Sequence, residues 1–246
     1  MILSLRLGFF VLFLAVWWVI SLKVPQGLFA SPYETLLAGQ QMLAEKRLWT
    51  ALLESMRVYF SGTLIAALAG IFIGGLMGSI RTFGRAVDVY VYALAATPRV
   101  AFVPMIIVLL GLGVSAKVFI VFLGAVMPVI INTYKGVQQA DENLIEMARS
   151  TGAGQARIVR HIIIPGAMPF ILAGLRLSAT LGLINTIVAE LYTAVSGLGG
   201  LLNIYGSSFR MAEYFVVVII LALLGVVVNE GLRLLEQRMT RWQVSR

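Results

Sequence analysis

The sequence predicts an all-α polytopic membrane protein with about six transmembrane helices, and three observations lead to this fold class. The mean hydropathy is +0.94, and 60% of the residues are hydrophobic while 12% are charged. Apolar runs of roughly 20 residues recur along the chain, long enough to cross a hydrocarbon core of about 30 Å. Lys and Arg gather at the ends of these runs, which is typical of membrane-protein loops.

Six spans are expected in order along the chain, separated by polar or charged connectors. They cover residues 7–22, 56–80, 87–110, 116–132, 170–190 and 214–234. The first run is followed by no small-residue cleavage site, so it is expected to be a retained span. We expect one membrane domain over 1–246, with the first span and an outer helix in 1–55, core spans in 56–235 and a cytoplasmic loop at 141–166.

The basic residues predict the orientation. The connectors at 81–85 and 135–160 and the tail at 233–246, together with Arg6, hold most of the 19 Lys and Arg residues. Positively charged loops stay in the cytoplasm, so both termini are expected there. The net charge of +8 then reflects membrane topology, and the absence of basic runs interleaved with aromatic residues argues against a nucleic-acid partner.

Short motifs predict two further helical features. Ser31, Pro32 and Glu34 occupy the N-cap, N1 and N3 positions of a capping box, so a helix is expected to begin there on the outer surface. The second span carries glycines that recur every four residues, a spacing that lets another helix approach closely. These are Gly70, Gly74 and Gly78, with Gly62 and Gly75 nearby, and we interpret them as packing residues.

No motif indicates an enzyme. The chain lacks a phosphate-binding G-x-x-x-x-G-K-[ST] loop, a G-x-S-x-G elbow and an H-E-x-x-H zinc motif. It has no cysteine and one histidine, which removes thiolate sites and most other metal sites. His161 is interpreted as a solvated or packed side chain, and no catalytic residue is expected.

The third span is expected to be broken at mid-depth. Pro98 and Pro104 remove backbone donors on either side of Arg99. Such a break is tolerated where it lines a watery path or is buried in protein. Two interpretations stay open: Arg99 lines a solute path and favours anions, or Arg99 pairs with an acid for packing. Glu190, at the outer end of the fifth span, is one candidate for that acid.

The segment 141–166 is the longest polar stretch between two spans. A helix is expected from Asp141 to Arg149, a glycine turn at Gly152 and Gly154, and a second short helix from 156 to 164 that Pro165 stops. Because connecting loops are usually short, we interpret this helical projection as a docking surface for a soluble partner.

The same segment resembles the cytoplasmic signature of binding-protein-dependent ATP-binding-cassette (ABC) importer permeases. That signature reads E-A-A, three residues, G, nine residues, I-x-L-P. Here Glu146-Met147-Ala148, Gly152 and Ile162-Ile163-Ile164-Pro165 stand at the same spacing. Met147 replaces an alanine and Ile164 replaces a leucine.

The resemblance covers almost the whole chain and is closest to the nitrate, sulfonate and taurine branch. It rests on the Ser31-Pro32 helix start, Pro98 to Pro104 with Gly111-Leu112-Gly113, Pro128 with Asn132-Thr133-Tyr134, Ala189-Glu190-Leu191, and Ser196-Gly197-Leu198-Gly199. That branch also includes importers of pyrimidine precursors and aromatic acids, so the resemblance does not name one solute.

The resemblance implies a type I ABC importer permease fold and the roles of several residues. Glu146, Met147, Ala148, Gly152, Ala153, Ile162 and Pro165 would couple to an ATPase subunit. Pro98, Arg99, Pro104 and Glu190 would line the translocation path. Gly197 and Gly199 would form a turn at the outer face, the outer gate that touches a binding protein.

The resemblance also implies the setting and the partners. The expected site of action is the inner membrane of a prokaryote, with a dimer of ATPases, a second copy of the permease and an extracytoplasmic solute-binding protein. ATP and magnesium would be bound by the ATPase, and no cofactor is expected in this chain. The alternative is a gradient-driven secondary transporter or channel, which would usually carry inverted repeats or intramembrane acids.

Overall fold

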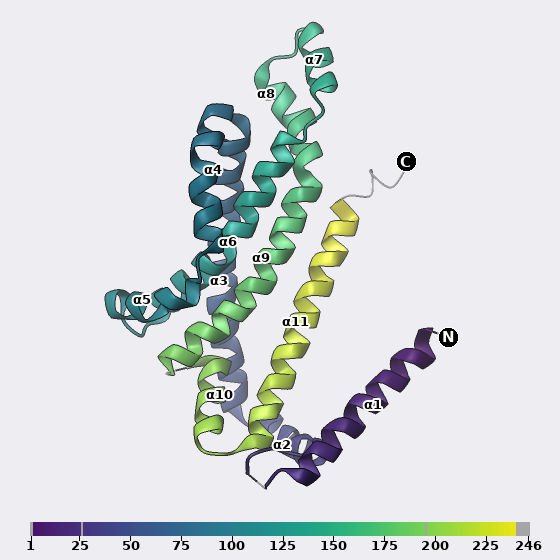
Figure 1. Ribbon diagram of the computed structural model, residues 1–246, viewed down its shortest axis with the longest axis vertical. Coiled ribbons are helices and arrows are strands. Elements are labelled where there is room, and N and C mark those ends of the chain that lie inside the picture. The colour runs from purple at the N-terminus through teal and green to yellow at the C-terminus, as the bar shows by residue number, and fades with distance from the viewer. Residues whose placement is uncertain (1, 26, 195, 240–246) are drawn as a thin grey trace. The chain divides into compact units, whose positions relative to one another are not determined.

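The computed structural model describes residues 2–25, 27–194 and 196–239, and all regular structure in them is helical, as predicted (Figure 1). The helices are α1 (Ile2–Lys23), α2 (Pro32–Ala44), α3 (Lys46–Ser79), α4 (Arg81–Ala96), the 3-10 turn η1 (Arg99–Phe102), α5 (Val103–Leu110), α6 (Val114–Gln138), α7 (Glu142–Ser150), α8 (Gln155–Ile158), the π turn η2 (Val159–Ile163), α9 (Ile164–Thr193), α10 (Gly197–Ser207) and α11 (Met211–Met239).

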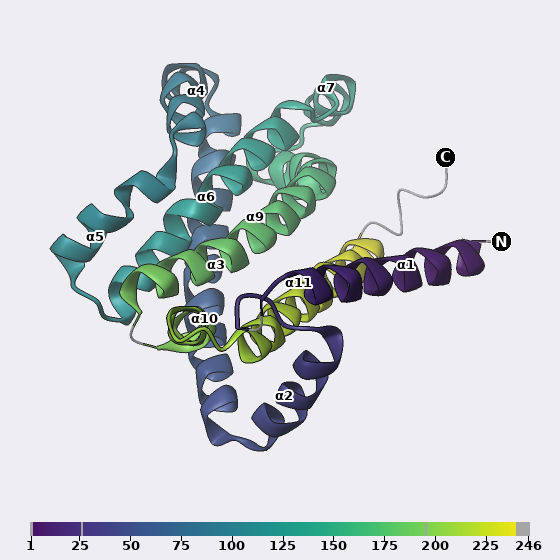
Figure 2. The same ribbon diagram turned by 60° about the horizontal axis from the view of Figure 1, so that its bottom comes forward.

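The number of membrane-crossing helices agrees with the prediction of about six. Within the described ranges, α1, α3, α6, the run from α8 through α9, and α11 are each long and apolar enough to cross a membrane. The pair α4 and α5 forms a sixth candidate that is bent by 82° at the break between Ala96 and Arg99. Figure 2 shows α5 leaving the direction of α4 at this point. The expected break in the third span is therefore present.

The chain forms two compact units, and each is described by itself. Unit 1 contains Met1–Met56 and Glu190–Leu224, and unit 2 contains Arg57–Ala189 and Gly225–Arg246.

Unit 2 is built on close contact between α3 and α6. A Cβ atom at Gly70 would lie 2.5 Å from Val129, and one at Gly74 would lie 2.5 Å from the Ile130 carbonyl oxygen. Because real Cβ atoms do not approach so closely, glycine is required at these positions. The interpretation of the glycines that recur every four residues as packing residues is therefore confirmed. Gly75 faces open space and takes no part in it.

The other face of α6 packs against α9 in the same unit. A Cβ at Gly136 would lie 2.7 Å from Phe170, and one at Gly174 would lie 2.9 Å from Asn132. Between α3, α4 and α6 lies an apolar core of Ala66, Met77, Val91, Ala125, Val126, Ile130 and Tyr134.

Unit 1 is held together by aromatic side chains around the start of α11. Phe215 lies 5.0 Å from Phe29 and 5.5 Å from Trp17 between ring centroids, and the Trp17 indole N–H donates to the Ala30 carbonyl at 2.9 Å. The predicted capping box begins α2: the Ser31 hydroxyl accepts from the Glu34 N–H, and the Glu34 carboxylate accepts from the Ser31 N–H.

The helix boundaries correct three predictions. The helix of the second span begins at Lys46, ten residues before the expected start. A helix, α10, occupies the segment that was interpreted only as a turn at Gly197 to Gly199. Pro165 does not stop a separate short helix: α8, η2 and α9 form one helical run from Gln155 to Thr193.

A π turn directly precedes Pro165 in this run. In η2 the N–H of Ile164 donates to the carbonyl of Val159, five residues earlier, so the hydrogen-bond register is shifted just before the proline. Proline cannot donate a helical hydrogen bond, so two irregularities of the backbone ladder lie next to each other here.

Candidate functional site

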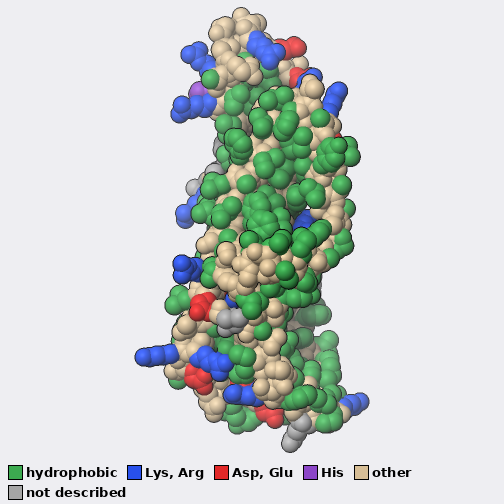
Figure 3. All heavy atoms as spheres, turned by 90° about the vertical axis from the view of Figure 1, so that its left-hand side faces the viewer, with side chains coloured by type: hydrophobic (Ala, Val, Ile, Leu, Met, Phe, Trp, Pro, Cys, Tyr) green, Lys and Arg blue, Asp and Glu red, His purple; other side chains and the backbone are tan. Residues whose placement is uncertain are grey.

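The loop between α6 and α9 projects α7 as an exposed helix. Asp141 caps its start, because one carboxylate oxygen accepts from the N–H groups of Asn143 and Leu144. No α7 side chain is buried, and two apolar residues are left exposed: Leu144 at 45% and Met147 at 61%. Figure 3 shows Lys, Arg, Asp and Glu side chains at this end of unit 2, as well as elsewhere on the surface. An exposed apolar face within a charged surface is typical of a docking site.

A glycine turn ends α7 and presents the rest of the signature. The N–H of Gly152 donates to the Arg149 carbonyl and that of Ala153 to the Ala148 carbonyl, both at 2.9 Å. Gly152 has φ +82°, which favours glycine, and no atom lies within 4 Å of a Cβ built on it. A partner can therefore approach the backbone here.

The remaining signature residues flank this turn. Glu146 is exposed, while Ala148 and Ala153 are half-buried. Ile162 and Pro165 are half-buried residues of the π turn and the first turn of α9. His161 is exposed, and its Nδ1 lies 3.1 Å from the Arg157 carbonyl oxygen, which agrees with a solvated side chain.

An ion pair fixes α7 to the start of α4. The Arg81 guanidinium lies 2.6 Å from the Glu142 carboxylate. Beside this pair is a hollow of about 490 Å³ whose wall also includes Arg85, Arg149 and Ile145. Both members of the pair are more than three-quarters exposed, so the pair orients the loop and adds little stability.

Arg99 donates to two carbonyls near the ends and breaks of helices. Pro128 has no N–H, so the Gly124 carbonyl of α6 lacks its helical donor; Arg99 donates to it at 3.0 Å. A second terminal nitrogen of Arg99 donates to Ala95 in the last turn of α4, also at 3.0 Å. Thr97 satisfies Ala93 and Leu94 beside it, so this stretch caps α4 before the bend.

The bend also borders an apolar hollow in unit 2. It has a volume of about 280 Å³ and is lined by Leu94, Thr97, Arg99, Phe102, Met105, Ile106, Phe119, Leu123 and Met127. Arg99 is half-buried, and its Nε has no hydrogen-bond partner among the described residues. Its terminal nitrogens donate to the two carbonyls, so this side chain combines a capping role with a charge at the wall of a hollow.

Glu190 lies in unit 1 and is fully buried. The Ser55 hydroxyl is 2.8 Å from both of its carboxylate oxygens, and the Gly199 N–H donates to one of them at 2.9 Å. The Leu198 N–H donates to Ser55 at 2.8 Å, and the Gly197 N–H donates to Glu54 at 3.1 Å. The first turn of α10 is thus held by side chains from α3 and α9.

Beyond this turn, unit 1 has an outer hollow of about 300 Å³. Arg47, Thr50, Glu54 and Ser196 line it together with the start of α10. Nearby, the Arg210 guanidinium lies 5.0 Å from the centre of the Tyr205 ring. Burial raises the pKa of Tyr205, so its hydroxyl stays neutral at physiological pH. The hydrogen bond that Arg210 donates to the Glu213 carboxylate raises the pKa of Arg210.

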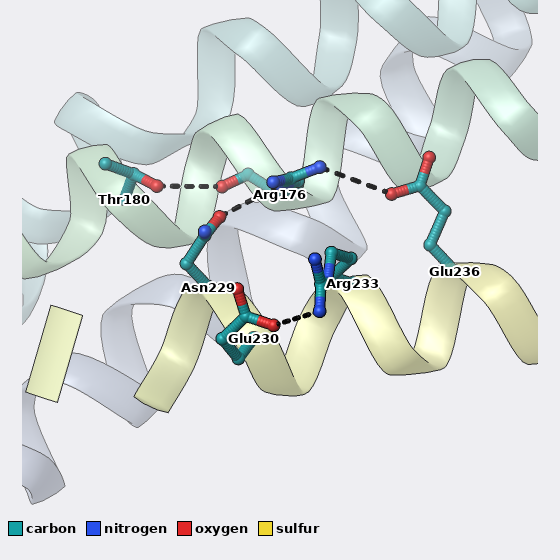
Figure 4. Close-up of polar contacts among 6 residues, drawn as sticks. All are labelled: Arg176, Thr180, Asn229, Glu230, Arg233 and Glu236. Atoms are coloured by element: carbon teal, nitrogen blue, oxygen red, sulfur yellow. Dashed lines mark hydrogen bonds and ion pairs between the residues drawn. The ribbon is translucent and has the colours of Figure 1, made fainter. Parts of the chain in front are cut away.

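A polar cluster that was not predicted from the sequence joins α9 to α11 in unit 2. Arg176 donates to Asn229 at 2.9 Å and lies 3.7 Å from Glu236, while Glu230 pairs with Arg233 (Figure 4). Charged residues inside spans usually pair across helices, so Arg176 within the fifth span was the signal that could have predicted this cluster.

Helices long and apolar enough to cross a membrane, an exposed helix in the loop between two of them and a bent span beside a hollow are the features expected of a transport permease. The family comparison agrees: residues 66–241 match the model of the binding-protein-dependent transport system inner membrane component. The chain belongs to this family. It is a permease subunit of an ABC importer and not an enzyme, and the family implies a membrane location, an ATPase and a binding protein as partners.

Individual relatives agree with this assignment. The chain is 29% identical to the taurine transport system permease protein TauC of Escherichia coli, over 97% of this chain and 90% of that protein. It is 39% identical to the putative aliphatic sulfonates transport permease protein SsuC of the same organism, over 64% of this chain and 60% of that one. A solved chain of the inward-facing MetNI methionine ABC transporter superposes with a TM-score of 0.69 at 19% identity, covering 80% and 99% of the two chains. The fold is therefore that of ABC importer permeases.

Proposed function

We propose that this permease carries a small anionic solute from an extracytoplasmic binding protein into the cytoplasm by alternating access. The segment that docks would be α7 with the Gly152 turn, and its partner would be a cytoplasmic ATPase subunit. The observation that carries this proposal is the exposed apolar pair Leu144 and Met147 on a helix with no buried side chain. Glu146, Ala148 and Ala153 would complete the docking surface, with Ile162 and Pro165 supporting it.

The translocation path is proposed to pass the bend between α4 and α5. Pro98 and Pro104 open the backbone there, and Arg99 supplies a positive charge at the wall of the apolar hollow. Two relatives are named for taurine and aliphatic sulfonates, and both of these solutes carry an anionic sulfonate group. An apolar hollow with one arginine fits that chemistry, with nitrate-like, aromatic or pyrimidine solutes as the wider class. Glu190 is fully buried in unit 1, so it would act without touching the solute.

The assembly is proposed to contain two copies of this chain around one path and two ATPase subunits. ATP and magnesium would be bound by the ATPases. Among the described residues no group of three or more His, Cys, Asp or Glu side chains could hold a metal ion. Both termini and the 141–166 loop would lie in the cytoplasm, in the inner membrane of a prokaryote, while Gly197 and Gly199 would lie at the outer face.

The proposal is tested by ATP hydrolysis in lipid nanodiscs. The permease is co-expressed with its cognate ATPase, and the Gly152→Asp and Gly154→Asp variants are compared with the wild type, with and without the binding protein. Gly152→Asp also strains the backbone, because residue 152 has φ +82°, which side chains other than glycine rarely adopt. Gly154 has φ −69° and open space above it, so Gly154→Asp controls for the added carboxylate alone, and thermal unfolding of both complexes separates strain from lost docking.

We expect the wild type and Gly154→Asp to be stimulated by the binding protein. Gly152→Asp should lower stimulated hydrolysis about tenfold, the effect of losing about 1.4 kcal/mol at an interface. If no ATPase co-purifies, or if the two aspartate variants behave alike, the docking assignment is wrong. A gradient-driven carrier would then be the better account of the chain.

A further inference from the structure

The first turn of α10 is held by an unusually complete set of partners. The N–H groups of three consecutive residues, 197 to 199, donate to Glu54, Ser55 and Glu190 in turn. These are the donors that a helix leaves unpaired at its start, where the helix dipole also favours a negative charge. We call Ser55, Glu190 and the first turn of α10 the clamp.

The clamp tolerates no side chain at its centre. Gly197 has φ +88°, and a Cβ atom on it would collide with the Glu190 carboxylate. Ser55 and Glu190 are both fully buried, and Ser55 donates to the carboxylate while it accepts from Leu198. Any displacement of α10 must therefore move the carboxylate or break its hydrogen bonds.

One side of the clamp faces the outer hollow of unit 1. Glu54, which accepts from Gly197, lines this hollow of about 300 Å³, and so do Ser196 and Gly197 themselves. Arg47 and Thr50 add a charged and a polar group to the same wall. A protein loop seated in the hollow would touch the residues that hold the start of α10.

The other side of the clamp belongs to the helix that begins in the docking loop. Glu190 lies three residues before the end of the helical run from Gln155 to Thr193. Gln155 directly follows the Gly152 to Gly154 turn, which is the proposed ATPase contact. One continuous helical backbone therefore joins that contact to the carboxylate that holds α10.

We propose that Ser55 and Glu190 are positioning residues that transmit binding-protein docking at the outer hollow to α9, and through it to the ATPase. The proposal rests on the proposed function. When the binding protein docks, α10 shifts. The buried Glu190 carboxylate moves with the α10 backbone that it is bonded to, and α9 moves with Glu190. Neither residue touches the solute.

The test separates docking from transmission. Ser55→Ala, Glu190→Gln and the double variant are assembled with the ATPase in nanodiscs, and hydrolysis is measured against binding-protein concentration. Ser178→Ala is the matched control, because it also removes a fully buried hydroxyl, one without a hydrogen-bond partner among the described residues. Thermal unfolding of each complex reports its assembly.

We expect Ser55→Ala and Glu190→Gln to keep unstimulated hydrolysis and the half-maximal binding-protein concentration. Their maximal stimulated rate should fall roughly fivefold, the effect of one buried hydrogen bond. The double variant should be no worse than the stronger single variant, since both break one network. Ser178→Ala should match the wild type.

Three results would overturn the proposal: stimulated rates like the wild type, a raised half-maximal concentration at an unchanged maximal rate, or loss of assembly together with unstimulated hydrolysis. The last would leave the clamp a purely structural feature. A wild-type complex that the binding protein does not stimulate would instead count against the proposed function.

Discussion

At the scale of single residues, prolines and the groups that compensate for them decide the geometry of the bend. Pro128 deprives the Gly124 carbonyl of a donor, and Arg99 supplies one from another helix. Asn132 donates to the Pro128 carbonyl in the next turn, at 2.8 Å. A buried acceptor without a donor costs about 1–3 kcal/mol, so these contacts allow proline to remain in α6.

Arg99 can be tested by a double-mutant cycle with Pro128→Ala. Arg99→Ala should destabilise the wild type by about 1–3 kcal/mol, because two carbonyls lose their donor. In the Pro128→Ala background the loss should be about 1 kcal/mol smaller, since residue 128 then donates to Gly124. Thermal unfolding in detergent measures both, with Arg85→Ala as an exposed control.

The same variants address the path. Uptake of an anionic solute by the Arg99→Ala protein should fall well below that of Arg99→Lys, which keeps the charge. Equal uptake by both variants and the wild type would contradict a role for Arg99 in the path.

At the scale of helices, close approach of α3 to α6 sets the spacing of unit 2. Gly74→Ala would place a methyl group 2.5 Å from the Ile130 oxygen and 2.8 Å from Thr133. Overpacking of this kind typically costs about 1–3 kcal/mol. Gly75→Ala meets nothing within 4 Å and should be neutral or stabilising by up to about 1 kcal/mol, because alanine favours helix.

The measurement is the unfolding temperature of the two alanine variants in the same detergent. Adjacent positions on one helix differ here only in the face that they occupy, so each variant controls for the other. Equal effects on stability would contradict the close contact between α3 and α6.

At the scale of the whole chain, cysteine labelling can establish which side of the membrane each loop occupies. The chain has no cysteine, so single cysteines can be introduced without a background signal. A membrane-impermeant maleimide added to intact spheroplasts should label Gln40→Cys, on exposed α2, and leave Thr151→Cys unlabelled until the membrane is permeabilised. The reverse pattern would contradict cytoplasmic termini.

Local chemistry made much of this fold predictable from sequence. Hydropathy gave the spans, the capping box at Ser31 gave α2, and Pro98 with Pro104 gave the broken span. The contact between Arg99 and α6 was not predictable, because it depends on the Gly124 carbonyl, 25 residues away, which Pro128 leaves without a helical donor.

The hydrogen bonds at the start of α10 were also not predictable, because they join residues that lie far apart in the sequence. Glu190 was recognised as unusual, but Ser55 is 135 residues away in sequence and looks ordinary in an apolar span. The pattern around Gly197 indicated a turn, since glycines are poor helix formers; the buried hydrogen bonds to Ser55 and Glu190 are what stabilise α10 there.

The π turn η2 also sets the angle at which the docking loop is presented. A π turn holds one residue more than an α turn, which changes the rotational phase of the helix by about 100°. If the face of α9 that packs on α6 is followed back through η2, it is therefore rotated by this amount when it reaches α8. Deleting one residue from 159–163 would rotate the Gly152 turn away from its present direction and leave every docking side chain in place. The direction in which this loop points therefore depends on the number of residues in the helix as much as on the residues of the loop.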